Sequence, residues 1–213
     1  MKKVLLVLTV VASMIVCTAS AALASGIYLE TLIGGNSAIT FDGIGDEGDS
    51  KGFLIGQHSE VNSFVYGWEY LGGNWEFPDG TEMDVEAFTI EGGYRVYYGD
   101  IISLAIILGY YNQDILYLNF NSLMFGTNFA FQFSNKASLE LCAAISLYGK
   151  MKMIGVDAGD AGILNYKIRF NYLITDHLGV SLGYHSYLTE HKDLSGTFAY
   201  NMDSFTAGIL YKF

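Results

Sequence analysis

Residues 161–175 read AGILNYKIRFNYLIT. Large apolar side chains occupy every second position from Leu164 to Ile174, and the positions between them include the charged residues Lys167 and Arg169. A strand places alternate residues on opposite faces, so this segment has one apolar face and one polar face. A period of two sustained over this length predicts a β-strand whose apolar face is turned outward or whose polar face is enclosed within the protein.

The same division recurs in five other segments, at 63–71, 84–98, 101–111, 121–133 and 137–149. In each, one face carries large aliphatic and aromatic side chains, and the other is rich in Gly, Ala and Ser. Small inward side chains suit a narrow barrel, and aromatic residues near strand ends suit membrane interfaces. The pattern favours an all-β transmembrane barrel over a soluble sandwich or lipocalin-like barrel, the alternative that also alternates.

Composition limits the other possibilities. The 213 residues include 22 acidic and 11 basic side chains, a formal charge of -11, yet 51% of the chain is hydrophobic. So apolar a chain is not disordered, and its acidity argues against a nucleic-acid partner. The 25 Gly, 16 Tyr and 14 Phe beside a single Pro are typical of strands and turns.

The first 24 residues have the order of a cleavable signal peptide. Lys2 and Lys3 precede an apolar run at 4–16, and Ala22-Leu23-Ala24 forms an A-x-A cleavage site. We expect cleavage after Ala24 and a single barrel domain over 25–213. An uncleaved anchor is the alternative, although its apolar run is short for a membrane span. Only Cys142 then remains, so no internal disulfide can form.

Short polar turns at 99–100, 134–136 and 175–177 recur at nearly regular intervals, with a candidate turn at 59–62 before them. The spacing predicts one antiparallel up-and-down barrel of ten strands. The expected strands are 27–35, 52–58, 63–72, 84–98, 101–112, 121–133, 137–149, 161–175, 178–190 and 203–213. The alternative is eight strands, with 36–62 as one long loop.

If the short turns face the periplasm, longer loops face outward at 36–51, 73–83, 113–120, 150–160 and 191–202. Much of the acidity falls within these ranges. The residues concerned are Asp42, Asp46, Glu47, Asp49, Glu76, Asp79, Glu82, Asp157, Asp160 and Asp193. We therefore expect anionic outer loops.

The last strand ends in a pattern formed by Thr206, Gly208, Tyr211 and Phe213. This pattern, with the signal peptide, resembles the C-terminal signal of outer-membrane barrels. Together with Gly52-Phe53-Leu54-Ile55-Gly56, Tyr66-Gly67-Trp68-Glu69-Tyr70 and Gly92-Gly93-Tyr94-Arg95, it makes the chain resemble the small outer-membrane β-barrel family that includes the OmpA transmembrane domain and opacity-type proteins. The resemblance implies insertion in the bacterial outer membrane and recognition of the last strand by the barrel assembly machinery. That family usually has eight strands, so ten would depart from it.

Eight charged residues fall on the predicted inward faces, four acidic and four basic. They are Glu30, Glu69, Glu91, Glu140, Arg95, Lys167, Arg169 and Lys212. Closure of the barrel makes the first and last strands neighbours, which predicts a pair between Glu30 and Lys212. The balance favours a salt-bridged plug, because buried charges require partners. An ion path or selectivity ring is the alternative.

Candidate catalytic groups fail on geometry. His185 and Ser186 suggest a lipid hydrolase, but adjacent strand residues face opposite sides. The run 58–60, His-Ser-Glu, fails for the same reason. Omptin-like proteases also have ten strands and use acidic residues with a His at the outer rim, but Asp176 and His177 lie in a turn at the other end.

Metal and cofactor sites are not expected. The four His are scattered, and no H-E-x-x-H or paired-Cys motif occurs. The acidic run at 42–49 could hold Ca²⁺ but lacks EF-hand spacing, so a solvated loop is favoured.

The sequence thus predicts a non-enzymatic outer-membrane barrel with a structural or surface-interaction role. A narrow solute channel is the first alternative and a lipid-modifying enzyme the second. The expected partners are outer-membrane lipid and lipopolysaccharide and the assembly machinery, with no nucleic acid and no cofactor; the oligomeric state stays open.

Overall fold

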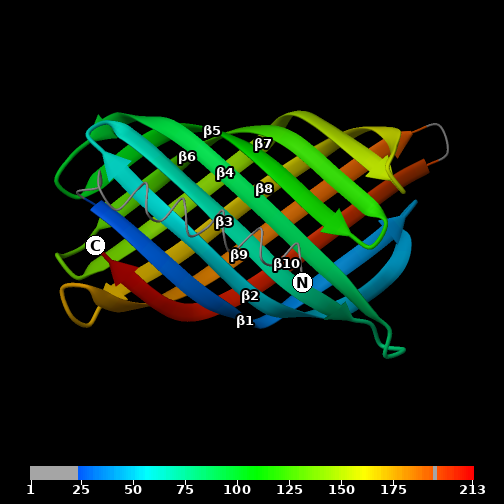
Figure 1. Ribbon diagram of the computed structural model, residues 1–213, viewed down its shortest axis with the longest axis horizontal. Helices are drawn as coiled ribbons and strands as arrows, with labels where there is room; N and C mark the ends of the chain where they lie inside the picture. The colour runs from blue at the N-terminus through cyan, green and yellow to red at the C-terminus, as the bar shows by residue number, and fades with distance from the viewer. Residues whose placement is uncertain (1–23, 194–195) are drawn as a thin grey trace.

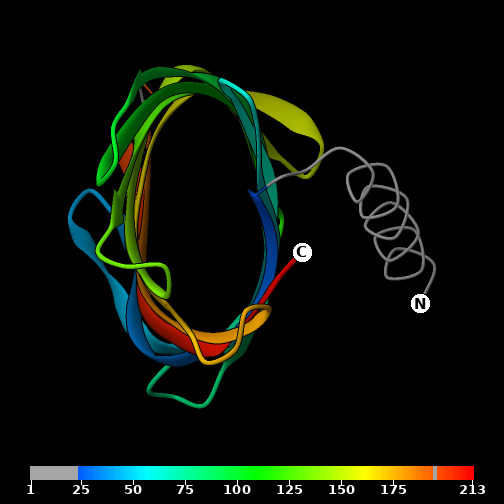
Figure 2. The same cartoon turned by 90° about the vertical axis from the view of Figure 1, so that its left-hand side faces the viewer.

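Ten antiparallel strands close into a barrel in the computed structural model, which describes residues 24–193 and 196–213 (Figure 1). The strands are β1 Ala24–Phe41, β2 Ile44–Val61, β3 Phe64–Glu76, β4 Glu82–Tyr98, β5 Ile102–Ile115, β6 Leu118–Gln132, β7 Ala137–Met153, β8 Val156–Leu173, β9 Leu178–Asp193 and β10 Gly196–Lys212. Each strand pairs with the next in sequence, and β1 pairs with β10, so the strands form a closed ring when viewed along the axis (Figure 2). The ten-strand prediction is confirmed. The eight-strand alternative is wrong, because residues 36–61 belong mostly to β1 and β2.

The prediction of long loops is wrong, and it is the main error in the predicted secondary structure. Most of 36–51, 73–83, 113–120, 150–160 and 196–202 is strand, and only residues 77–81 form a loop longer than two residues among the connections described at that end. The turns Asp42-Gly43 and Ile154-Gly155 have two successive positive φ values, at 52° and 78° and at 52° and 79°. Such turns match the twist of paired strands, so pairing continues to the hairpin tip even where the side chains are polar.

We call the end at which β1 begins and β10 ends the terminal end, at the left in Figure 1, and the opposite end the tip end. The predicted signal peptide, residues 1–24, lies outside the described residues except for Ala24. Within residues 24–193 and 196–213, no helix is long and apolar enough to cross a membrane.

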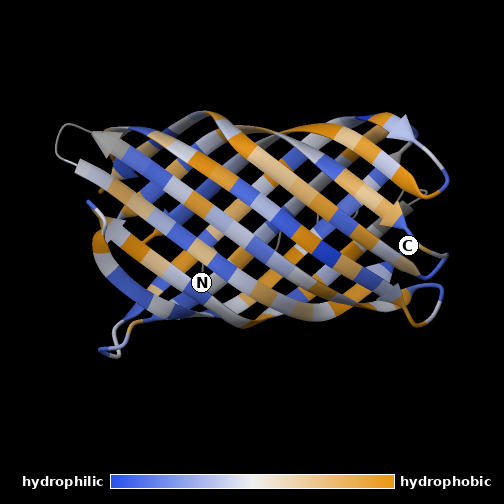
Figure 3. Cartoon of the chain, turned by 180° about the vertical axis from the view of Figure 1, so that it is seen from behind, coloured by the Kyte–Doolittle hydropathy of each residue, from blue (hydrophilic) through white to orange (hydrophobic). Residues whose placement is uncertain are grey.

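The outer face is apolar around the middle of the barrel, as the alternation predicts. Along β8, for example, Leu164, Ile168 and Phe170 are exposed, whereas Asn165 and Arg169 between them are buried. Figure 3 shows the same alternation of hydrophobic and hydrophilic residues along most strands. Tyr211 and Phe213 of the predicted C-terminal signal are exposed near the terminal end, with ring centroids 5.3 Å apart.

The interior differs between the two halves of the barrel. Small inward residues line the terminal half, as expected. The tip half is instead filled by a cluster of large apolar side chains, which sequence analysis missed. We call its stacked rings the aromatic plug: Trp75 with Tyr200 at 4.7 Å between centroids, Tyr111 with Tyr187 at 5.7 Å, and Phe120 with Phe198 at 6.1 Å.

Candidate functional site

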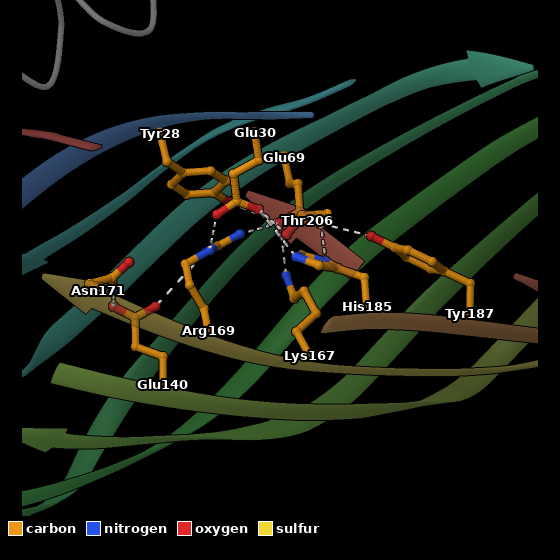
Figure 4. Close-up of polar contacts among 10 residues, drawn as sticks. All are labelled: Tyr28, Glu30, Glu69, Glu140, Lys167, Arg169, Asn171, His185, Tyr187 and Thr206. Carbon is orange, nitrogen blue, oxygen red and sulfur yellow. Dashed lines mark hydrogen bonds and ion pairs between the residues drawn. The ribbon is translucent and has the colours of Figure 1, made fainter. Parts of the chain in front are cut away.

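A network of charged side chains crosses the lumen on the terminal side of the aromatic plug (Figure 4). Its central members are Glu30 of β1, Glu69 of β3, Lys167 and Arg169 of β8, and His185 of β9. All five occupy inward positions of their strands. The closed topology therefore brings together residues that are up to 155 positions apart in the chain.

Arg169 is the hub of the network. Its Nε donates to Glu30 Oε1 at 2.8 Å, and its Nη2 donates to Glu69 Oε2 at 3.4 Å. The guanidinium also stacks on the ring of Tyr28, with Cζ 3.6 Å from the centroid. One buried cation thus pairs with two carboxylates and packs against an aromatic face.

Glu69 accepts hydrogen bonds from three further groups. Tyr187 donates to Oε1 at 2.7 Å, Tyr28 donates to Oε2 at 2.9 Å, and Lys167 donates to Oε2 at 3.3 Å. Glu69 is only 3% exposed, so these donors replace the water that a carboxylate would otherwise bind.

Glu30 does not pair with Lys212, and that prediction is wrong. Strands β1 and β10 are neighbours as expected, but Glu30 lies opposite Gly208, and Lys212 lies opposite Gly26. Glu30 Oε2 instead accepts a hydrogen bond from Thr206 at 2.8 Å and lies 3.5 Å from His185 Nε2. The adjacency of strands follows from closure, whereas their stagger does not.

The four other predicted residues lie at the edge of the network or outside it. Glu140 joins the edge of the network, 3.9 Å from Arg169 Nη1. Arg95 forms a different ion pair, with Glu60, nearer the terminal end. Glu91 lines a small cavity of about 20 Å³ beside the network but forms no ion pair with another described residue. Lys212 lies at the mouth of the lumen.

Five members of the network were not assigned to it from the sequence. They are Tyr28, Asn171, His185, Tyr187 and Thr206. Each has the same inward parity as a charged residue on its own strand or on a neighbouring strand, and this parity was the available signal. Their hydroxyl, amide and imidazole groups surround the charges with polar partners.

The candidate hydrolase groups stay apart. His185 is fully buried inside the lumen, and Ser186 lies on the opposite face of β9. His58 Nε2 is 3.7 Å from Glu60 Oε1, while Ser59 between them accepts a hydrogen bond from Gln57. Among the described residues, no group of three or more His, Cys, Asp or Glu is arranged to hold a metal ion.

The tip end carries an acidic rim. Its exposed carboxylates are Asp42, Asp46, Glu47, Asp49, Glu76, Asp79, Glu82, Asp84, Glu86, Asp114, Asp157 and Asp160. Only Glu76 and Asp160 among them form ion pairs with described lysines, Lys51 and Lys150. In the β3–β4 loop, the hydrogen bond from the Thr81 backbone amide lowers the pKa of the Asp79 carboxyl. The acidity lies at the expected end, mostly on strands, with Asp42 in a turn and Asp79 in the β3–β4 loop. The side chain of Asp193 is outside those described.

Comparison with known proteins yields structural matches alone. No protein-family model matches the chain, and no curated protein matches it in sequence. The outer membrane protease OmpT from Escherichia coli matches with a TM-score of 0.62 and 11% identity, over 90% of this chain and 97% of that one. An outer membrane channel from Pseudomonas putida F1 matches at 0.51 and 7%, over 90% and 95%. Neisserial surface protein A matches at 0.42 and 12%, over 89% and 97%.

At such identities the likeness concerns the fold, because one fold can serve many activities. Strand order, closure and the apolar outer face agree with that likeness. The chain therefore has the fold of the small outer-membrane β-barrel proteins.

Proposed function

We propose that the protein is an integral barrel of the bacterial outer membrane with a non-enzymatic structural or surface-contact role. The apolar outer face, the aromatic residues near the terminal end and the fold support membrane insertion. In this orientation the terminal end faces the periplasm and the acidic rim faces outward. Export would use the signal peptide over residues 1–24, with cleavage after Ala24.

The observation that carries a non-conducting role is the double closure of the lumen. The network spans it on one level, with Glu69 held by Arg169, Lys167, Tyr28 and Tyr187. The aromatic plug fills the next level toward the tip end. Paired charges and stacked rings occupy these two levels of the lumen, which supports a barrel that does not conduct ions.

Single-channel recording in a planar bilayer tests this proposal. Detergent-refolded protein should insert and remain silent, with heat-modified gel mobility showing that it is folded. Discrete openings of the folded protein would replace the structural role with the solute-channel alternative.

A lipid-modifying activity that uses a serine nucleophile is disfavoured by the placement of the candidate serines. Ser186 and Ser59 lie on the face of their strands opposite to His185 and His58, out of reach of these bases. One similar structure is named a protease, so an unstructured peptide and purified lipid A are the substrates to test. Neither should be cleaved by the folded protein, and cleavage that Ser186→Ala abolishes would overturn the non-enzymatic proposal.

The acidic rim supports contact with cationic surfaces outside the cell. Carboxylates without described lysine partners attract cations, and the range of this electrostatic attraction becomes shorter as the salt concentration rises. Lipopolysaccharide could be reached through divalent cations, which the rim would share with lipid phosphates.

A further inference from the structure

A cavity of about 160 Å³ lies in the terminal half of the lumen, between the network and the terminal mouth. It exists because Gly26, Ala130 and Ser138 present small side chains inward at this level. Its volume equals that of roughly five water molecules at about 30 Å³ each. The space thus admits a small organic molecule.

Two lysines at the mouth of the cavity have no anionic partner. Lys136, in the β6–β7 turn, and Lys212, at the end of β10, both line the cavity, and neither forms an ion pair with another described residue. Each carboxylate of the lining has another cation beside it: Glu60 pairs with Arg95, and Glu140 lies 3.9 Å from Arg169 Nη1 and accepts a hydrogen bond from Asn171. The mouth therefore carries unbalanced positive charge.

The inner part of the cavity offers an unsatisfied acceptor. Asn171 is 6% exposed and lines the cavity; its Nδ2 donates to Glu140, but its Oδ1 has no hydrogen-bond partner. A buried polar atom without a partner is costly, and a ligand group that donates to it removes that cost. Leu173 and Leu210 supply apolar wall between this acceptor and the mouth.

We propose that this cavity binds a small organic anion from the periplasmic side. The anionic group, a carboxylate or phosphate, lies between Lys136 and Lys212. A hydroxyl or amide N–H at the other end of the ligand donates to Asn171 Oδ1. This site is separate from the surface role proposed above, and the conductance of the barrel does not decide it.

Thiol labelling tests whether the charge at the mouth of the cavity is positive. Ser138→Cys, in a Cys142→Ser background, places one thiol in the lining; Ala130→Cys is a second site if the first does not fold. Two methanethiosulfonate reagents are compared, the anionic ethylsulfonate and the cationic ethyltrimethylammonium. The rate at which each labels the thiol is divided by the rate at which it labels free cysteine, which corrects for the intrinsic reactivity of the reagent. The anionic reagent should be favoured by about tenfold, as in a cleft lined by one sign of charge.

Lys136→Gln with Lys212→Gln should abolish that preference. Lys152→Gln, which removes one positive charge at the tip end, should leave it unchanged and is the control for each single lysine variant. An equal or greater rate for the cationic reagent in the parent would overturn the proposal.

Protection from labelling tests binding itself. Glycolate, which carries a carboxylate and a hydroxyl, should slow modification of Ser138→Cys at a lower concentration than acetate does. Asn171→Leu should remove the difference between the two anions while folding, judged by gel mobility, is retained. If neither glycolate, acetate nor inorganic phosphate protects the thiol, the cavity is a hydrated vestibule and the binding proposal is wrong.

Discussion

Arg169 is the residue on which the centre of the lumen depends. Its partners Glu30 and Glu69 are almost fully buried, and Lys167, which lies 3.3 Å from Glu69, forms no ion pair with Glu30 among the described residues. Buried charges are stable as a set, but removing one member leaves the others uncompensated. The loss of a single member of this set should therefore lower the stability of the barrel strongly.

Arg169→Leu should lower the free energy of unfolding by about 3–5 kcal/mol, the usual cost of breaking a buried ion pair. Urea titration of the refolded protein in detergent, followed by tryptophan fluorescence, measures the change. Arg95→Leu is the matched control, because its partner Glu60 is more accessible and keeps His58 nearby. Equal losses in the two variants would contradict a special role for Arg169.

Sequence reasoning at this scale found the charges and missed the pairings. Inward parity selected Glu30, Glu69, Lys167 and Arg169 correctly. The pair of Glu30 with Lys212 failed because stagger between strands depends on the shear of the whole barrel, which no local pattern encodes.

The hairpin tips are the elements in which sequence and backbone disagree. Ile154, a β-branched residue, has φ 52°, in the left-handed region that such residues rarely adopt. By contrast, Asp42-Gly43 is a typical signature of a two-residue hairpin, and it could have corrected the expected 36–51 loop.

Ile154→Asn should raise the free energy of unfolding by about 1 kcal/mol, because Asn tolerates positive φ better. The control is Ile44→Asn, at a tip residue of similar exposure, 82% against 78%, without positive φ. Thermal or urea unfolding of both variants measures the effect. If Ile44→Asn raised the free energy of unfolding as much as Ile154→Asn does, the gain would come from a more polar surface and not from the backbone conformation.

The pairing of β1 with β10 explains why position 208 is a glycine. A Cβ at this position would overlap the Leu29 carbonyl oxygen and crowd the Glu30 backbone across the β1–β10 seam. Gly208→Ala should therefore destabilise the barrel by about 1–3 kcal/mol. Gly92→Ala, where a Cβ meets nothing within 4 Å, is the control and should be neutral in the same unfolding assay.

For the whole molecule, alternation predicted the class and the outward face, because lipid exposure imposes one rule on every strand, and the spacing of the turns predicted the strand number. The filling of the tip half was not predictable in this way. Trp75, Tyr111 and Tyr200 have inward parity, but parity does not tell at which height they meet.

The two closures in series predict non-additive conductance. Removing only the Trp75–Tyr200 pair of the plug, with Trp75→Ala and Tyr200→Ala, should leave the barrel silent, and so should replacing Glu30, Glu69 and Arg169 together by Ser. The combined variant should show openings in a planar bilayer. Openings after either change alone would mean that one level closes the lumen by itself.

The strands are longer than a membrane requires. Eighteen residues extend about 60 Å at ~3.4 Å each, or roughly 45 Å along the axis at a tilt of about 40°, against an apolar band of about 25 Å. The hydrogen-bonded wall would therefore rise above the bilayer and end in two-residue turns at β1–β2, β5–β6 and β7–β8. Proteases need a flexible segment of several residues to bind. On intact cells, proteinase K should thus cleave at 77–81 before any of these three tips, whereas trypsin should not cleave there, because 77–81 contains no Lys or Arg.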